Sequence, residues 1–329
     1  MRSVLPVGIV SVGAAAPPKV LTNFDLEKIV DTSDEWIRTR SGISSRHIAD
    51  DDSGTCDIAY PAAVMALERA KLAAEDLDAI VVATITPDAP LPSTACLLQH
   101  RLGATNAAAY DVVAACTGFI YALSVASAQV ATGQVRNALV LGVDTLSKVT
   151  DYTDRSTCVL LGDGGGAVVL KPVPEGRGLL SFYLRADGGG KELLQIPAGG
   201  SKLPASHETI DQRQHYLQMN GAEVYKFAVR AVEDAITAAL TRAGLTHEDV
   251  TLVFPHQANI RIIEAAAKRS SIPEAKWVNN IATYGNTSAG SIPLALNDAY
   301  EQGRLHAGDV YVMVAFGGGL TWGASEMRW

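Results

Sequence analysis

Residues 111–119, with the sequence DVVAACTGF, join a β-like apolar segment to a helical one. The apolar lead-in predicts a strand that ends near Ala114. The small and apolar residues that follow predict a helix to about Thr132, with Gly133 suited to its end. Because almost every residue of that helix is small or apolar, we expect it to be buried on all sides. Cys116 then lies at the strand-to-helix turn.

Working outward, the chain alternates between short apolar runs and longer amphipathic stretches. The apolar runs predict strands that are buried on both faces, at residues 79–85, 107–113, 138–143, 167–170, 250–254 and 310–316. The stretches with helical spacing cover residues 56–73, 224–243, 259–269 and 292–302. Strands that alternate with helices in this way predict a layered α/β fold.

Two glycine runs suggest that the chain contains an internal duplication. Residues 161–167 read LGDGGGA and residues 316–323 read FGGGLTWG, and each run adjoins a β-like segment. We place the boundary between two halves near residue 175, so that they span residues 1–175 and 176–329. The polar, glycine-rich residues 187–215 predict a surface excursion between the halves.

Composition narrows the classes of function. The 329 residues are 48% hydrophobic and 19% charged, with a formal net charge of −8, so nucleic acid is a poor partner. No run approaches the roughly 18–20 apolar residues of a membrane helix, and residues 1–13 predict an opening strand rather than a secretory signal. The four cysteines form no C-x-x-C pair, which indicates no zinc site, no disulfide framework and a cytoplasmic location.

Cys116 is a candidate nucleophile because of its expected position. The N–H groups and the positive end of the dipole at a helix N-terminus favour a thiolate, which is the reactive form of cysteine. The same local sequence is also typical of a small cysteine that only fills space in the core.

Two later segments favour the chemical interpretation. Residues 253–259, VFPHQAN, place His256 after a buried strand and before a helix, and residues 284–291, YGNTSAGS, place Asn286 in a glycine-flanked loop before another helix. Alone, His256 fits a structural histidine and Asn286 fits a turn or an N-cap. Together with Cys116 they supply a nucleophile, a base or donor, and an amide donor, each at a junction between a strand and a helix.

These three segments resemble those of the β-ketoacyl-[acyl carrier protein] synthase III family, the initiating condensing enzymes of type II fatty acid synthesis. Residues 33–43 (SDEWIRTRSGI), residues 152–155 (YTDR) and the closing FGGGLTWG match as well, so the resemblance spans nearly the whole chain. It implies a thiolase-like fold with two similar halves in five α/β/α/β/α layers, and a homodimer. It also implies a reaction that joins an acyl-CoA primer to malonyl-[acyl carrier protein] and releases CoA and carbon dioxide, with no cofactor or metal.

The resemblance assigns a role to each catalytic candidate. Cys116 carries the acyl group as a thioester, and His256 and Asn286 hold the malonyl thioester carbonyl while decarboxylation makes it an enolate. This requires His256 to present a protonated Nε2 to the substrate. The N–H groups of Cys116 and Gly318 form an oxyanion hole. Elongating relatives have a second histidine in place of Asn286, so the asparagine favours the CoA-primed class.

Substrate contacts are also implied by the resemblance. The residues expected to bind CoA are Trp36, Arg40, Arg155, Gly221 and Asn259, by stacking on the indole and by pairing with phosphate. The stretch expected to bind the acidic acyl carrier protein is Gln257, Ala258, Asn259, Ile260 and Arg261, which Lys226, Lys268 and Arg269 extend. Leu91 stands where the family often has a phenylalanine that reaches across the dimer into the acyl pocket. The expected primer is therefore acetyl-CoA or, because leucine has less bulk, a somewhat longer or branched acyl-CoA.

Other classes remain as alternatives. A ketosynthase or acyltransferase of specialised metabolism on the same fold would share Cys116, His256 and Asn286, and only substrate profiling separates it. A thiol hydrolase also uses Cys, His and Asn, but its nucleophile usually lies near the mature N-terminus. A non-catalytic condensing-fold subunit would be expected to lack the nucleophile.

Overall fold

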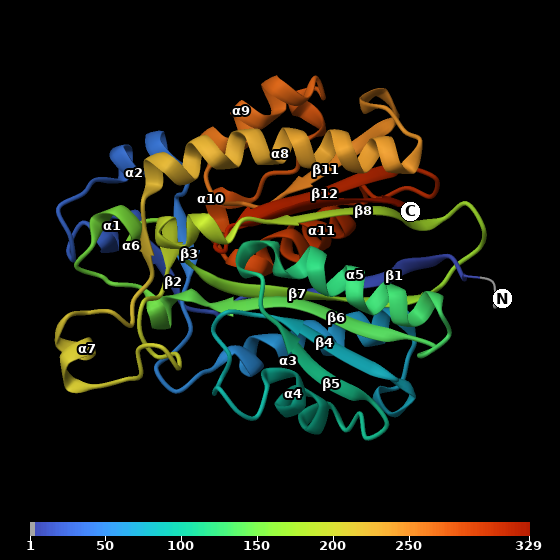
Figure 1. Cartoon of the computed structure of the whole chain (residues 1–329), viewed down its shortest axis with the longest axis horizontal. Coiled ribbons are helices and arrows are strands. Elements are labelled where there is room, and N and C mark those ends of the chain that lie inside the picture. The colour runs from blue at the N-terminus through green and yellow to red at the C-terminus, as the bar shows by residue number, and fades with distance from the viewer. Residues whose placement is uncertain (1–3) are drawn as a thin grey trace.

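The computed structural model describes residues 4–329, so residues 1–3 of the opening segment and of the first half lie outside the described residues. Two β-sheets are each covered by helices on both faces, which gives the five layers visible in Figure 1. The strands of the two large sheets are β1 (Val7–Ala15), β4 (Ala79–Ala83), β5 (Ala108–Val112), β6 (Ala138–Thr145), β7 (Asp163–Pro172), β8 (Gly178–Ala186), β11 (Val250–Pro255), β12 (Val310–Gly317) and β13 (Thr321–Arg328). The expected α/β/α/β/α arrangement is confirmed.

The first sheet has the strand order β1-β7-β6-β4-β5. β1 pairs antiparallel with β7 and β7 antiparallel with β6, whereas β6, β4 and β5 run parallel. All eight residues of β6 and all five of β4 are buried, which explains why their sequences are continuous apolar runs rather than alternating ones.

The second sheet repeats this order as β8-β13-β12-β11. Its pairs have the same directions as in the first sheet: β8 and β13 antiparallel, β13 and β12 antiparallel, β12 and β11 parallel. Where β5 borders β4 in the first sheet, Trp277 forms a parallel bridge with Val253 of β11. The matching topology confirms that the chain consists of two similar halves.

Six helices make up the three helical layers. α3 (Thr55–Ala70) and α4 (Thr94–Leu102) cover the outer face of the first sheet, and α8 (Gly221–Ala243) and α9 (Ile260–Ser270) cover that of the second. Between the sheets lie α5 (Gly118–Ala131) and α11 (Ser291–Glu301). All the strands and helices that the apolar runs and helical spacings predict are present, but α5 is not buried all round, because Val125 remains 42% exposed.

The two halves approach each other backbone to backbone at glycines. A Cβ on Gly142 of β6 would lie 2.2 Å from the carbonyl oxygen of Ala289, and one on Gly290 would lie 2.3 Å from that of Gly164 in β7. Only glycine, which has no Cβ, allows the two backbones to come this close. The close approach brings the 3₁₀ turn Ser288–Gly290 of the second half against the first sheet.

The remaining helices and strands are β2 (Val20–Thr22), α1 (Asn23–Leu26), α2 (Asp34–Ser41), β3 (Ser45–His47), α6 (Arg155–Cys158), β9 (Leu194–Gln195), α7 (His207–Asp211), β10 (Gln218–Met219) and α10 (Ile281–Tyr284). The chain leaves the first sheet at Pro172 and enters the second at Gly178, and the division at residue 175 remains a prediction.

The expected surface excursion needs a correction. Residues 199–208 are exposed, but Leu194 and Ile196 on one side of this exposed part and Leu217 on the other line an internal cavity. The excursion therefore folds back over the molecule and forms a wall of the site.

Candidate active site

Cys116 lies where the sequence predicts, between β5 and α5. β5 ends at Val112, a 3₁₀ turn covers Ala115–Thr117, and α5 begins at Gly118. Ala115 has a φ of 47°, in the left-handed region that a residue with a side chain rarely adopts. This turn directs the chain sharply from the strand into the helix, and Cys116 faces a cavity that it helps to line.

Burial raises the pKa of the Cys116 thiol to about 12, and the nearby Asp144 carboxylate adds to the rise, whereas the Ser288 hydroxyl opposes it. Burial therefore acts against the thiolate that the helix N-terminus is expected to favour.

His256 follows β11 directly and is 3% exposed. Its Nδ1 lies 2.8 Å from the Oγ of Ser291, the first residue of α11. The ring of Phe316 meets it edge-on, with centroids 5.5 Å apart and planes at 66°. Burial lowers the pKa of His256 to about 3, so the imidazole is neutral throughout the physiological range.

Asn286 is fixed by its backbone and by its side-chain oxygen. Its N–H donates to the Leu160 carbonyl at 2.8 Å, and its own carbonyl accepts from the N–H of Gly162 at 2.9 Å. The N–H of Ser288 donates to Oδ1 of Asn286 at 2.9 Å. The oxygen of the amide is thus occupied, and its two N–H donors remain for a ligand in the cavities that Asn286 lines.

Two cavities meet at Cys116 and Asn286. The smaller, of about 350 Å³, is walled mainly by apolar side chains that come from both halves and from the excursion, including Ile85, Leu146, Leu161, Leu194, Ile196, Leu217 and Met219. The larger, of about 680 Å³, is a tunnel that His256 also lines and that reaches Trp36 and Arg40 on α2. The three catalytic candidates therefore lie at the inner end of one tunnel.

The tunnel also gathers most of the residues expected to bind CoA. Trp36, Arg40, Gly221 and Asn259 line it. Arg155 does not line the tunnel, but its guanidinium lies 5.0 Å from the centroid of the Trp36 ring, and that of Arg40 lies 5.7 Å from it. The mouth thus presents an indole flanked by two cations.

The glycines after β12 adjoin the nucleophile. A Cβ on Gly317 would lie 2.7 Å from the backbone nitrogen of Cys116, and Gly318 lines the smaller cavity together with Cys116. Among residues 4–329, neither the N–H of Cys116 nor that of Gly318 donates to a backbone carbonyl. Two N–H groups free of backbone bonds therefore adjoin the cavity beside the thiol.

The expected carrier-binding stretch is only partly on the surface. Gln257 is 1% exposed, and its amide donates to the carbonyls of Pro255 and Val278, so its expected contact with the carrier is wrong. Ile260 is half-buried beside Gly42, where it leaves room only for glycine. Ala258 and Asn259 are partly exposed, and the Asn259 side chain caps α9. Arg261 is exposed at the tunnel mouth.

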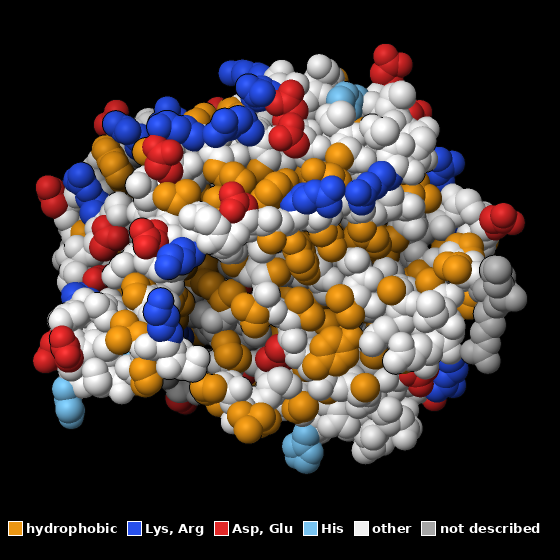
Figure 2. Space-filling model, viewed as in Figure 1, with side chains coloured by type: hydrophobic (Ala, Val, Ile, Leu, Met, Phe, Trp, Pro, Cys, Tyr) orange, Lys and Arg blue, Asp and Glu red, His pale blue; other side chains and the backbone are white. Residues whose placement is uncertain are grey.

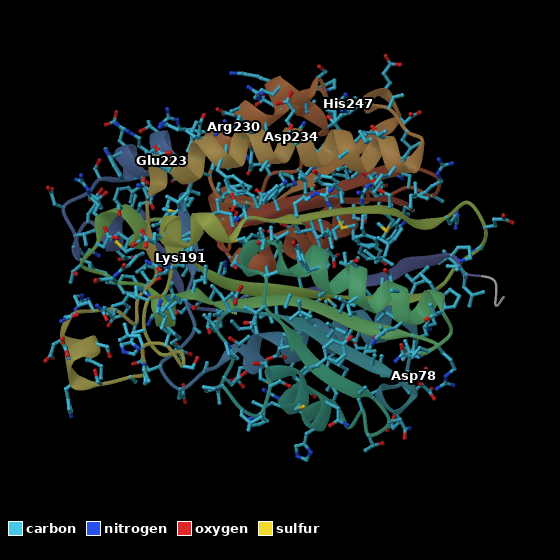
Figure 3. The ribbon with its side chains drawn as sticks, in the orientation of Figure 1. Asp78, Lys191, Glu223, Arg230, Asp234 and His247 are labelled. Carbon is cyan, nitrogen blue, oxygen red and sulfur yellow. The ribbon has the colours of Figure 1, made fainter. Side chains whose placement is uncertain are left out.

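The basic residues that were expected to extend this stretch differ in their partners. Lys226 forms an ion pair with Glu223 at 2.7 Å, and Arg269 pairs with Glu233. Lys268 is exposed. Figure 3 shows Glu223, Arg230 and Asp234 along the outer side of α8, so charges of both signs alternate there. This surface is mixed rather than uniformly basic, and Arg261 and Lys268 are the cations most available to a partner.

Leu91 does not line either cavity within its own chain. Its side chain is 86% exposed, on the loop between β4 and α4. Val113, which lines the smaller cavity, is itself 76% exposed. The cavity wall at Val113 thus belongs to the molecular surface of the single chain.

Sequence reasoning missed three polar residues at the site. Ser288 and Ser291 hold Asn286 and His256, and Asp144 accepts from the hydroxyls of Thr84 and Thr86 and from the N–H of Ile85, which lines the smaller cavity. Both serines lie in the motif that contains Asn286, at positions that begin helical turns. No sequence motif marks Asp144 as a site residue, because Thr84, Ile85 and Thr86, which donate to it, lie some sixty residues earlier in the chain.

Residues 4–329 contain no group of three or more His, Cys, Asp or Glu arranged to hold a metal ion. Nor does this part of the chain contain a helix with the length and apolar character that crossing a membrane requires.

Comparison with known proteins agrees with this geometry. Residues 110–188 match the family described as 3-oxoacyl-[acyl-carrier-protein (ACP)] synthase III, and residues 240–329 match its C-terminal family. The chain is 53% identical, over 99% of its length and 98% of the relative, to a β-ketoacyl-[acyl-carrier-protein] synthase III of Caldanaerobacter subterraneus.

Solved structures give the same result. The 3-oxoacyl-[acyl-carrier-protein] synthase III of Aquifex aeolicus superposes with a TM-score of 0.91 at 46% identity, covering 98% of this chain and all of that one. The priming β-ketosynthase of the R1128 polyketide pathway gives the same TM-score at 33% identity, covering 100% of this chain and 97% of that one.

Proposed function

The chain belongs to the β-ketoacyl-[acyl carrier protein] synthase III family and is an acyltransferase of fatty acid biosynthesis, and we propose that it works through a thioester on Cys116. In this proposal an acyl-CoA primer condenses with malonyl-[acyl carrier protein] to give β-ketoacyl-[acyl carrier protein], CoA and carbon dioxide. The observation that carries it is the meeting of Cys116, His256 and Asn286 at the inner end of one tunnel.

The first step transfers the acyl group. The Cys116 sulfur attacks the thioester carbonyl of acyl-CoA, the bond from that carbonyl to the CoA sulfur breaks, and the thiol proton of Cys116 ends on the departing CoA sulfur. The N–H groups of Cys116 and Gly318, which donate to no backbone carbonyl among residues 4–329, support a role as donors to the oxyanion that forms in between. The net charge of the site is the same before and after this step, because the proton moves from one thiol to the other.

The second step makes the carbon nucleophile. The malonyl carboxylate leaves as carbon dioxide, its bonding electrons form an enolate, and the thioester oxygen gains negative charge. The neutral His256 and the amide of Asn286 are suited to donate hydrogen bonds to that oxygen. The enolate carbon then attacks the acyl group on Cys116, whose sulfur leaves as a thiolate and takes up a proton.

The shape of the tunnel supports CoA as the acyl donor. An indole flanked by Arg40 and Arg155 suits an adenine ring with nearby phosphates, and Gly221 and Asn259 lie further along the wall. The apolar cavity of about 350 Å³ on the other side of Cys116 is suited to the acyl chain. No part of this reaction calls for a metal or a further cofactor.

The carrier protein is proposed to dock at the tunnel mouth. Figure 2 shows a row of Lys and Arg side chains along the edge over α2 and the beginning of α8. Arg261 adjoins this edge as an exposed tunnel-lining cation. Such a local basic surface on a protein of net charge −8 is complementary to an acidic partner.

A homodimer is proposed from the edge of the first sheet. β5 is an edge strand, and Leu91, Val113 and Val125 are exposed to 86%, 76% and 42%. Figure 2 shows hydrophobic side chains across the middle of this face, over β8 and α5. A second copy paired along β5 would cover them and could bring its own Leu91 to the cavity wall at Val113.

Location and pathway complete the proposal. The four cysteines are all free thiols, which is typical of the reducing cytoplasm. A role in specialised metabolism is the second candidate, because the priming ketosynthase of the R1128 pathway shares 33% identity over the whole chain. The identity of 53% to a fatty acid synthase component favours the first.

The test incubates the protein with radiolabelled acyl-CoAs of different chain lengths and with malonyl-[acyl carrier protein]. We expect label on the peptide that contains Cys116, followed by its transfer to a β-ketoacyl product. Cys116→Ala should remove both. Label on another peptide would refute the assignment of the nucleophile, and the absence of condensation product with every primer would refute the reaction.

A further inference from the structure

We propose that the Ser291 hydroxyl is a positioning group that sets the proton of His256 on Nε2. The inference rests on the proposed function, because it explains how a neutral histidine becomes a donor to the enolate oxygen. It concerns a residue that does not touch the substrate and acts only through the imidazole.

The contact is short and enclosed. Oγ of Ser291 lies 2.8 Å from Nδ1 of His256, and the two residues are 2% and 3% exposed. A hydrogen bond of this length contains one proton, which belongs either to the serine oxygen or to Nδ1. Which of the two carries it determines whether Nε2 is a donor or an acceptor.

The other contacts of Ser291 decide between the two arrangements. The backbone N–H of Gln257 donates to the same Oγ at 3.3 Å, so one lone pair of the hydroxyl is already used. Among residues 4–329, Nδ1 of His256 is the sole acceptor within reach of the Ser291 hydroxyl proton. If Nδ1 carried the proton, the hydroxyl proton would be buried without a partner, at a cost that the opposite arrangement avoids.

The charge state of His256 completes the inference. Burial keeps the ring neutral, so it carries a single proton, and a ring that accepts at Nδ1 must hold that proton on Nε2. The edge-on contact with Phe316 fixes the plane of the ring. His256 lines the tunnel, and in the described part of the chain Nε2 has no partner, so its N–H is available for a substrate oxygen.

The role predicts a selective defect. Without the hydroxyl, Nδ1 is buried with no hydroxyl donor, and the tautomer of His256 is no longer fixed. Loss of the partner that orients a metal-ligating histidine typically costs about 10- to 100-fold in activity, and we expect a loss of the same order for His256. The loss should fall on decarboxylation of malonyl-[acyl carrier protein], which needs the Nε2–H donor, and not on acyl transfer from CoA to Cys116.

The experiment combines a tautomer measurement with the two half-reactions. In ¹⁵N-histidine-labelled protein, the signals absent from His256→Gln identify His256, and a protonated Nε2 with an unprotonated Nδ1 is expected. Ser291→Ala should lose decarboxylation and keep acyl loading, and Ser291→Thr, which retains the hydroxyl, should recover it. Ser270→Ala is the matched control, because Ser270 is also 2% exposed and its hydroxyl donates only to the Ala267 carbonyl on α9.

Each outcome has a definite meaning. A protonated Nδ1 in the wild-type protein would overturn the inference without any variant, and so would a Ser291→Ala protein that decarboxylates normally. Equal loss of both half-reactions in a folded Ser291→Ala protein would show a general structural role instead. If His256→Gln itself decarboxylates normally, the proposed role of His256 fails, while the ¹⁵N signals still decide the tautomer.

Discussion

The backbone N–H of Ser288 donates to the side-chain Oδ1 of Asn286 at 2.9 Å, and this one contact determines which end of the amide faces the substrate. Asn286→Asp retains the bond to Ser288 but replaces the outward NH₂ donors with a carboxylate oxygen. We expect the decarboxylation rate to fall by about 100- to 1,000-fold, the usual cost of losing an oxyanion donor.

This prediction is checked by release of labelled carbon dioxide from malonyl-[acyl carrier protein]. Asn286→Gln, which keeps an amide but extends it by one methylene, is the companion variant. Normal carbon dioxide release by Asn286→Asp would show that the amide donates nothing to the enolate.

The second prediction concerns the resting state of Cys116. Because burial holds the thiol pKa at about 12, its alkylation by iodoacetamide should accelerate about tenfold per pH unit between pH 6 and 9, as the thiolate fraction increases. Peptide mapping separates Cys116 from the exposed Cys96, which reports the integrity of the reagent. A rate for Cys116 that is already level above pH 7 would mean that the thiolate is the resting form.

The third prediction concerns the carrier. Arg261→Glu should reduce kcat/KM for malonyl-[acyl carrier protein] by about tenfold at low salt, with a smaller loss at high salt, because the lost attraction is screened. Acyl loading from CoA should suffer less, although Arg261 also lines the tunnel mouth. Arg177→Glu, which reverses an exposed charge on the turn between β7 and β8, is the control. Equal losses in the two half-reactions would argue against carrier docking at Arg261.

The fourth prediction concerns the choice of primer. If Leu91 of a second copy completes the acyl cavity, Leu91→Phe should narrow it and lower the rate with isobutyryl-CoA relative to acetyl-CoA by about tenfold. Val20→Phe introduces a phenylalanine at another exposed position and should change nothing. A strict preference for acetyl-CoA in the wild-type protein would contradict the expectation of a roomier cavity.

The fifth prediction concerns stability. Glu326 is fully buried on β13, where burial raises its pKa from 4.5 to about 7 and the Ser181 hydroxyl donates to one of its oxygens at 2.6 Å. Between pH 4.5 and 7 the folded chain binds more protons than the unfolded chain, so the contribution of this carboxyl to stability falls as pH rises. The full penalty, about 3 kcal/mol, is present above pH 7.

Glu326→Gln removes that titration. It should therefore leave stability near pH 5 almost unchanged and raise it by up to about 3 kcal/mol near pH 8, measured by urea unfolding at both pH values. Glu248→Gln is the control, because Glu248 is exposed in the turn directly before β11 and its carboxyl should not show this pH dependence. The same stability difference at both pH values would show that the carboxyl titrates normally in the folded protein.

Much of the fold could be predicted because the central strands are buried on both faces and are continuous apolar runs. β8 was missed for the converse reason, since most of its residues are only half-buried and its sequence mixes Ser and Arg with apolar residues. Cys116 follows β5 of the first sheet and His256 follows β11 of the second, so the strand-to-helix junctions predicted both positions. The junction expected at Asn286 is wrong, because this residue lies between α10 and the 3₁₀ turn Ser288–Gly290 rather than after a strand.

The properties that the sequence did not indicate depend on segments far away in the chain. Burial is the main cause of the raised thiol pKa, and Leu194, which lines both cavities beside Cys116, comes from the excursion that was expected to be surface. Gln257 lies next to His256 and looks like a surface donor, but the carbonyl of Val278 and the N–H of Asn280 satisfy its amide inside the protein.

The glycine contacts between the halves have a consequence for divergence within the family. A methyl group at Gly142 or Gly290 would overlap a carbonyl oxygen of the other half. Because the overlapped atom belongs to the backbone, no side chain can move aside to make room for the substitution. The relative placement of nucleophile and donors is thus inherited as a fixed unit. Exchange of the side chains of Leu194, Ile196 or Leu217 would reshape the acyl cavity, while the glycine contacts hold the spacing between Cys116 and Asn286.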